Sequence, residues 1–427
     1  MIELKNKKKT KWKRLDNAAK IFPPTSTDKD TKVFRFALEL YEYVESDILQ
    51  EALDVTMESF PFYMTVLRRG MFWHYFEKTD KKAVVEMENT TICAPIYFPD
   101  EKELLFRVFY YGKRINLEIH HSLTDGTGAI WLLNTLIYYY LIIKYKKEFE
   151  NDKPQMPFNQ SISKQTDDSF QKYYTGSKKI KYKKQTKAYR INGTRTEDNR
   201  NIYIEGSMSV ESVLKEARKY NTTLTGFLAS VFIYSMYKDM SIRQQKDPIV
   251  LSVPVNLRRF FNSGSARNFF GTIRIEYNFS EEGDSFDNIV NTINRSLKEN
   301  LTEEKLNNQI NRFMALENNR LAKIVPLPIK NVILRIADVI NERGITAGIS
   351  NIGRITFPEE FHPYIYQVSI CTAARRPQLS ICSYNDNLTL GLTSPFIETS
   401  IQYNLFEFLS KAGIDVNIAS NIEEVED

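Results

Sequence analysis

Two adjacent histidines followed by an aspartate are the clearest candidates for chemistry in this chain of 427 residues. Residues 120–126 read His-His-Ser-Leu-Thr-Asp-Gly, and the whole chain contains four histidines. Histidine exchanges protons near neutral pH, so it can act as a general base when a neighbouring group orients it. The segment therefore predicts a general-base site. Asp125 could be the partner of the base or a structural clamp, and its four-residue offset favours the clamp because it places Asp125 in the turn.

The two histidines are expected to differ because side chains alternate along a strand. His121 follows the apolar row that ends at Ile119, whereas His120 points to the opposite face and would order the strand end. His121 is thus the candidate base, and a partly desolvated imidazole stays neutral and able to accept a proton. A histidine at such a place can also be a satisfied core residue. Adjacent strand residues cannot easily chelate one ion, and the sequence has no cysteine–histidine cluster, so we expect no metal site.

The pattern of apolar residues predicts the elements that would position this segment. Strands over Leu104–Tyr111 and Arg114–His120, joined at Gly112–Lys113, would place the histidines at the end of a hairpin. The apolar run Ala129–Ile143 is short for a membrane span and predicts a buried helix directly after the motif. The other predicted helices are Asp47–Glu58, Ser209–Tyr220 with Ser209 as N-cap, Thr225–Tyr237, long helical segments over Phe286–Glu317, and Leu405–Ala412. The other predicted strands are Phe60–Leu67, Met71–Phe76, Asn201–Glu205, Ile249–Val255, Phe269–Tyr277, Ile345–Ile355, Tyr364–Cys371, Gln378–Tyr384 and Leu388–Leu392.

Length and composition indicate a large globular protein built from two halves. The chain is 42% hydrophobic and 13% aromatic, which supports an extensive core. Residues 166–200 are rich in polar residues and are expected to form a linker or crossover. They would separate an N-terminal unit of residues 1–165, which carries the histidines, from a C-terminal unit of residues 201–427. Because both units mix strands and helices, we expect an α/β or α+β architecture.

Charge and cysteine content limit the choice of partner and compartment. The 58 basic and 53 acidic residues give a net charge of +5, too mild to indicate a nucleic-acid partner. Two tracts are rich in basic residues, Lys5–Arg14 and Lys178–Lys187. They could form ordinary solvated surface, or they could attract an anionic ligand. Such a ligand would be a phosphate-bearing cofactor or an acidic carrier protein. The three cysteines, Cys93, Cys371 and Cys382, favour a reducing compartment, and with no apolar leader or transmembrane segment apparent we expect a cytoplasmic monomer.

Residues 120–126 match the HHxxxDG motif, and the chain thereby resembles the superfamily related to chloramphenicol acetyltransferase. That superfamily includes the condensation domains of non-ribosomal peptide synthetases, the plant BAHD acyltransferases and the alcohol acetyltransferases. The resemblance implies an α/β fold of two chloramphenicol-acetyltransferase-like subdomains, with mixed β-sheets flanked by helices and the active-site channel between them. The early position of the motif is similar to that in two-domain members. The DFGWG motif of the BAHD branch is absent from the sequence, which disfavours that branch.

A second segment that resembles the superfamily contains an arginine. Residues 254–258, Pro-Val-Asn-Leu-Arg, resemble the strand end whose arginine pairs with the motif aspartate. The resemblance implies a salt bridge between Arg258 and Asp125 that fixes the turn carrying His121, with Arg259 as the alternative partner. Residues 268–272 resemble the glycine-containing strand that follows. From the residues alone, Arg258 could equally be a charged side chain on the protein surface, next to Arg259.

A third resembling segment, residues 350–353, reads Ser-Asn-Ile-Gly. It is similar to the SNxG segment of the alcohol acetyltransferase and condensation-like branches. The resemblance implies that Ser350, Asn351 and Gly353 lie near the substrate channel. The same four residues also fit a simple turn.

The resemblance further implies a reaction, namely acyl transfer from a CoA thioester to an alcohol, with an acetyl or other short acyl group. His121 would remove the acceptor's proton, and His120, Asp125, Gly126 and Arg258 would support it. No covalent acyl-enzyme and no permanently bound cofactor would be needed, since acyl-CoA is a cosubstrate. The other substrates would be small molecules.

Two other functions fit the same residues. The first is a condensation-like enzyme that takes its acyl group from a phosphopantetheinyl thioester on an acyl or peptidyl carrier protein and transfers it to an amine or an alcohol. The second is a non-catalytic binding protein that keeps the fold. Degenerate relatives of that kind would be expected to lose the second histidine or the glycine, and this sequence retains His121, Asp125 and Gly126.

Overall fold

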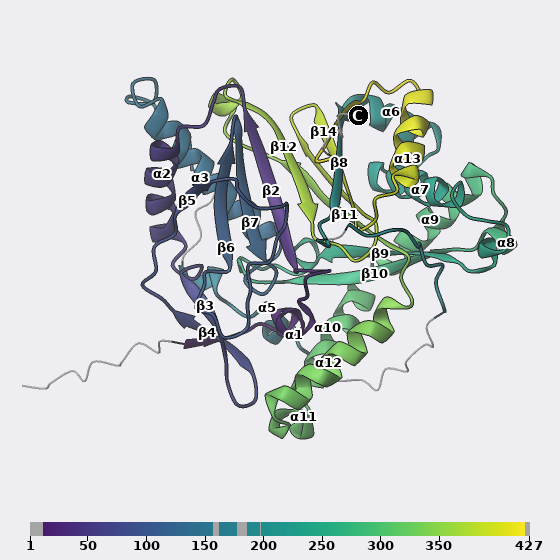
Figure 1. The fold of residues 1–427 in the computed structure, drawn as a ribbon, viewed down its shortest axis with the longest axis horizontal. Coiled ribbons are helices and arrows are strands. Elements are labelled where there is room, and N and C mark those ends of the chain that lie inside the picture. The colour runs from purple at the N-terminus through teal and green to yellow at the C-terminus, as the bar shows by residue number, and fades with distance from the viewer. Residues whose placement is uncertain (1–11, 157–161, 177–185, 197, 423–427) are drawn as a thin grey trace, which may run out of the picture.

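The computed structural model describes residues 12–156, 162–176, 186–196 and 198–422 of the chain (Figure 1). Most of the two basic tracts, residues 5–11 and 178–185, lies outside the described residues. The described part is a mixed α/β structure with two sheet-rich halves, each flanked by helices, as the sequence predicted.

A five-stranded sheet carries the candidate histidines. The apolar faces of its strands, such as Leu117 and Ile119 on β7 (Arg114–His120), pack with residues of α2 (Ser46–Ser59) and α3 (Gly126–Lys144) in one core. The predicted hairpin of β6 (Phe106–Tyr111) and β7 is confirmed, and Tyr111 pairs with Arg114. The sheet order is β12 (Ile365–Thr372), β2 (Val33–Leu40), β7 (Arg114–His120), β6 (Phe106–Tyr111) and β5 (Val85–Met87).

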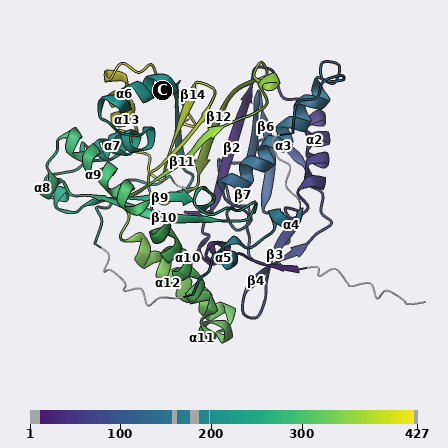
Figure 2. The ribbon, with the colours of Figure 1, turned by 180° about the vertical axis from the view of Figure 1, so that it is seen from behind.

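A seven-stranded sheet forms the framework of the second half. Its strands pack with several helices in a second core, seen on the side of the molecule away from α2 and α3 (Figure 2). The sheet order is β10 (Phe270–Tyr277), β9 (Ile249–Asn256), β11 (Ala347–Ile355), β13 (Gln378–Tyr384), β14 (Asn387–Ser394), β8 (Ile202–Ser209) and β15 (Asn417–Ser420). The helices of this core are α6 (Val210–Lys219), α7 (Leu224–Tyr237), α9 (Phe286–Asn300), α10 (Glu303–Asn318) and α13 (Ser400–Lys411).

Strand β12 connects the two halves. It comes late in the chain but pairs antiparallel with β2, so it completes the sheet of the N-terminal half. Its other contacts are with the seven-stranded sheet, where the backbone carbonyl of Val368 accepts hydrogen bonds from the Thr389 hydroxyl and the Cys382 thiol. The division into sheets therefore does not follow the order of the chain.

The remaining elements complete the fold. A small sheet contains β1 (Trp12–Arg14), β4 (His74–Lys78) and β3 (Thr65–Arg69). The strands predicted over 60–67 and 71–76 are both present as β3 and β4, but each begins later than predicted, because residues 61–64 and 71–73 form turns and bends. The expected crossover contains α4 (Ile162–Gln165) and α5 (Ser169–Lys172), and α12 (Leu327–Glu342) had no counterpart among the predicted elements. The other short helices are α1 (Phe22–Thr25), α8 (Phe279–Glu282), α11 (Arg320–Ile324) and the 3-10 turns Ala18–Ile21, Gln244–Lys246, Leu257–Arg259 and Glu359–Phe361.

Among the described residues, α3 alone is long and apolar enough to cross a membrane. In its most apolar window, 61% of the residues are buried inside the fold, and its side chains contribute to the core of the five-stranded sheet. This burial agrees with the buried helix predicted after the motif. All three cysteines are buried free thiols.

Candidate active site

A cavity of about 760 Å³ lies between the two halves, and His121 is part of its wall. The wall includes Phe34 and Gly126 from the N-terminal half, and Asn256 and Ser350 from the C-terminal half. Strand β7 ends at His120, and the backbone N–H of His121 donates to the carbonyl of Lys32 at 2.8 Å. The end of the strand therefore presents His121 to the cavity.

Aromatic side chains hold the His121 ring. Phe22 of α1 stacks on it with the ring centroids 5.0 Å apart, and Phe34 of β2 lies at 4.5 Å. The Nδ1 atom of His121 is buried, and the backbone of Thr124 interacts with the ring. Burial lowers the pKa of His121 to about 4, although the nearby Asp125 carboxylate acts to raise it. The imidazole is therefore neutral at physiological pH and has a free nitrogen lone pair.

His120 lies outside the cavity lining and is fully engaged. Its Nδ1 accepts a hydrogen bond from the backbone N–H of Ser122 at 3.2 Å, and its Nε2 lies 2.9 Å from the Ser26 hydroxyl. A neutral imidazole that accepts at Nδ1 carries its proton on Nε2, so His120 donates to Ser26. Burial lowers the pKa of His120 to about 3. The opposite orientations of the two histidines agree with strand alternation.

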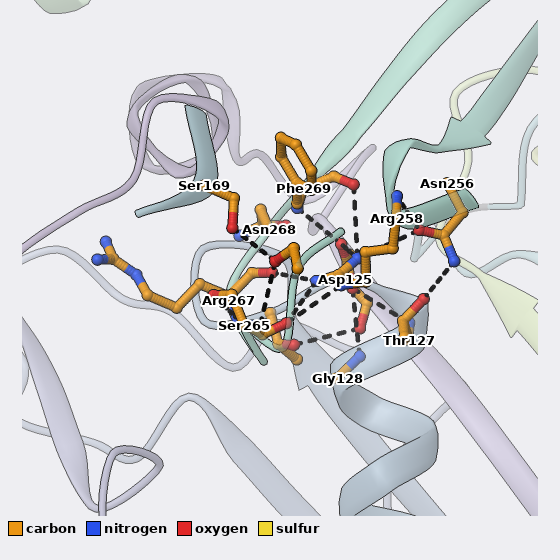
Figure 3. Close-up of polar contacts among 12 residues, drawn as sticks. Asp125, Thr127, Gly128, Ser169, Asn256, Arg258, Ser265, Arg267, Asn268 and Phe269 are labelled. Carbon is orange, nitrogen blue, oxygen red and sulfur yellow. Dashed lines mark hydrogen bonds and ion pairs between the residues drawn. The ribbon is translucent and has the colours of Figure 1, made fainter. Parts of the chain in front are cut away.

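Asp125 organises the turn between His121 and helix α3 (Figure 3). Its Oδ1 accepts hydrogen bonds from the N–H groups of Thr127 and Gly128, so Asp125 is the N-cap of α3. Its Oδ2 accepts from the N–H of Phe269 at 2.8 Å and from the Arg258 guanidinium at 2.7 Å. The structure thus contains the ion pair that the resemblance implied, and it adds an N-cap function that the sequence reasoning missed. An aspartate directly before Gly-Thr-Gly and an apolar helix was the available signal.

Arg258 connects this turn to the segment 265–269. Its guanidinium donates to the backbone carbonyls of Ser265 at 2.9 and 3.1 Å and to the carbonyl of Phe269 at 3.4 Å. The Arg258 side chain is 7% exposed, so the interpretation as a surface charge is wrong. Arg259 instead lines the cavity and makes no ion pair among the described residues.

Asn268 contacts the backbone of the candidate base, a role that its residue type and position in the sequence did not indicate. Its side-chain amide donates to the carbonyl of His121 at 3.0 Å. Asn268 is buried, and its partner lies 147 positions away in the chain. In the sequence, Asn268 belongs to the segment 268–272, which resembles a glycine-containing strand of the superfamily. That resemblance assigned no function to Asn268.

The predicted channel residues of the Ser-Asn-Ile-Gly segment do not all lie at the cavity. Ser350 and Asn351 line the cavity, whereas Gly353 does not. Asn351 donates to the Thr225 hydroxyl at 2.7 Å and accepts from the N–H of Gly353 at 2.8 Å. Strand β11 has a bulge here and Gly353 has a φ of 89°, a conformation that favours glycine. Gly353 thus shapes the strand that presents Ser350 and Asn351.

Cationic side chains outnumber carboxylates on the cavity wall. Arg375 is paired with Asp30 and Arg376 with Glu342, so these two arginines are compensated. Arg259 and Lys298 are exposed and make no ion pair within the described residues. These two side chains leave positive charge that can attract an anionic substrate.

Comparison with known proteins identifies relatives of this architecture. The family model for alcohol acetyltransferase matches residues 54–369. TRI101 of F. graminearum, solved with coenzyme A and T-2 mycotoxin, superposes with a TM-score of 0.63 at 11% identity, over 95% of this chain and 99% of that one. The first condensation domain of the CDA synthetase gives 0.57 at 13%, over 92% and 93%. Polyketide synthase associated protein 5 of Mycobacterium tuberculosis gives 0.59 at 14%, over 93% and 96%. No curated protein matches by sequence.

Proposed function

Because the chain belongs to the alcohol acetyltransferase family, we propose that it transfers an acyl group from a CoA thioester to an alcohol, with His121 as the general base. The observation that carries the proposal is an imidazole that burial keeps neutral, on the wall of a cavity of about 760 Å³ between the two halves. A base that is already deprotonated is ready to accept a proton over the whole physiological pH range.

The proposed reaction needs one proton acceptor and no covalent enzyme intermediate. His121 Nε2 takes the proton of the acceptor hydroxyl while that oxygen attacks the thioester carbonyl. The tetrahedral intermediate collapses, the carbon–sulfur bond breaks, and the leaving thiolate takes the proton back from the imidazolium. The products are an ester and free CoA. Asp125, Arg258 and Asn268 keep the His121 backbone in place through the contacts described above.

The charge of the cavity supports CoA as the donor. CoA carries phosphate groups, and Arg259 and Lys298 are cavity-lining cations without a carboxylate partner in the described part of the chain. TRI101, which has a similar fold, is described in complex with coenzyme A. We propose that these two side chains bind CoA phosphates. Their replacement by alanine is expected to raise KM for acetyl-CoA more than it lowers kcat.

The decisive experiment replaces the proposed base. Thiol release from acetyl-CoA in the presence of a panel of alcohols is expected to fall by about 10²–10⁴-fold in His121→Ala. His362→Ala is the matched control, since His362 lies outside the cavity lining. Both variants should melt like the wild type. Release by His121→Ala within a few-fold of wild type would exclude His121 as the base.

The carrier-protein donor is tested in the same assay. Similarity in fold to a condensation domain is the observation that keeps this donor as the second candidate. An acetylated phosphopantetheinyl carrier, supplied in place of acetyl-CoA at equal concentration, would be the better substrate if the chain acts as a condensation-like enzyme. Loss of acyl transfer with both donors would instead favour the non-catalytic binding protein. We further propose a cytoplasmic monomer, and light scattering tests the oligomeric state.

A further inference from the structure

Helix α12 exposes its apolar face to solvent. Its branched aliphatic side chains recur at the spacing of one helical face, i, i+3, i+4, i+7, i+10 and i+11. Each of them is between 50% and 57% exposed. The residues of this face, which we call the α12 apolar face, are Ile329, Val332, Ile333, Ile336, Val339 and Ile340. Helices of globular proteins normally bury such a face, so α12 has the reverse of the usual orientation.

The polar side of α12 attaches the helix to the protein. The Lys330 side chain is buried, donates to the carbonyl of Phe72 at 3.0 Å and lies 3.6 Å from the Trp73 ring centroid. Asp338 pairs with Arg375 of the cavity wall at 2.7 Å. These contacts are specific and fix which side of the helix faces outward. The exposure of the apolar face is therefore built into the fold.

Two further exposed apolar side chains lie on the elements that precede α12 in the chain. Ile324 at the end of α11 is 68% exposed, and Leu316 of α10 is 59% exposed. Figures 1 and 2 show α11 and the start of α12 projecting from the body of the molecule, away from both sheets. A projecting apolar surface of this kind marks an interaction site.

The charges around this surface favour an anionic partner. Glu342 of α12 and Glu317 of α10 are neutralised by Arg376 and Lys20, and Asp338 is paired as described above. Arg320, Lys323 and Arg343 lie along the same elements, are exposed, and make no ion pair among the described residues. The surface is thus apolar in the middle and positively charged at its ends.

We propose that the α12 apolar face binds the surface of an anionic phospholipid bilayer. Aliphatic side chains of an amphipathic helix insert below the headgroups, and the adjacent cations contact lipid phosphates. A symmetric dimer through the same face is disfavoured, because it would bring Arg320, Lys323 and Arg343 of two copies together. Glu342 and Ile345 line the cavity, so the bilayer would lie about one helix diameter, ~10 Å, from the cavity wall.

Vesicle binding of the full chain tests the proposal and needs no acyl transfer. Wild-type protein is expected to cosediment with vesicles made of equal parts phosphatidylcholine and phosphatidylglycerol, and less with phosphatidylcholine alone. The double variant Ile333→Glu/Ile336→Glu places charges on the apolar face, where both side chains are already exposed. Its vesicle partitioning is expected to fall at least about tenfold. Ile242→Glu is the matched control, since Ile242 is 85% exposed on a different part of the chain, and should bind like wild type.

The charge requirement is tested separately. Arg320→Gln/Lys323→Gln should reduce binding to the anionic vesicles and leave the weaker binding to phosphatidylcholine unchanged. Failure of the wild type to cosediment with anionic vesicles would overturn the proposal, as would equal binding by Ile333→Glu/Ile336→Glu. A wild-type dimer that this double variant converts to a monomer, with no vesicle binding, would assign the face to self-association instead.

Discussion

Replacement of Asp125 by alanine tests the structural core of the site. Asp125 is 5% exposed, and its carboxylate accepts hydrogen bonds from three backbone N–H groups and from Arg258. The variant Asp125→Ala removes all four acceptor contacts. The buried Arg258 guanidinium then has no carboxylate partner. The N-terminus of α3 also loses its side-chain cap.

The expected loss of stability follows from these contacts. Breaking a buried ion pair by removing one partner costs about 3–5 kcal/mol. Arg258 keeps its bonds to the carbonyls of Ser265 and Phe269, which favours the lower end of the range. Loss of an N-cap alone costs about 1 kcal/mol. At about 2.1 cal/mol/K per residue, unfolding of the whole chain has an entropy of about 0.9 kcal/mol/K, so 3 kcal/mol corresponds to a Tm lower by about 3 °C.

Differential scanning calorimetry of wild type and variants provides the measurement. Asp54→Ala is the matched control, because Asp54 pairs with Lys82 at 2.8 Å but both side chains are exposed. Exposed pairs contribute about 0–1 kcal/mol, so this control should shift Tm by about 1 °C or less. An Asp125→Ala variant whose Tm equals that of Asp54→Ala would refute the assignment of Asp125 as a structural clamp.

The remaining predictions concern pH and the two glycines at the start of α3. Because burial lowers the pKa of His121 to about 4, kcat/KM should stay constant as pH falls from 8 to about 5; an inflection near 6.5 would contradict the neutral, desolvated base. Gly128→Ala should unfold at lower temperature than wild type, since its Cβ would lie 2.2 Å from the backbone carbonyl oxygen of Ala266. Gly126→Ala should melt like wild type, because its Cβ would meet only the tip of the Ile352 side chain at 3.0 Å; equal melting temperatures for the two glycine variants would refute this difference.

Much of the candidate site could be predicted because its signals are local. The alternation of side chains along β7 separates His121 from His120 without any tertiary information. The apolar run after the motif predicted α3, and the hairpin β6–β7 was predicted from its turn. By contrast, residues 60–67 have the composition of a strand, but only residues 65–67 belong to one, and tertiary packing places residues 61–64 in a turn with Phe60 and Tyr63 in the core.

Residue type and spacing are local properties of the chain, so they were enough to indicate which residues could do chemistry. How these residues are held depends on the tertiary structure: the Asn268 side chain donates to the carbonyl of His121, 147 positions away, and Phe22 stacks on the His121 ring. It also decided that β12 joins the N-terminal sheet and that the apolar face of α12 points outward. A helical pattern fixes which residues share a face, but the partner of that face comes from distant parts of the chain. The sequence therefore predicted His121 as the candidate base, and the fold determined the surroundings that keep its imidazole neutral.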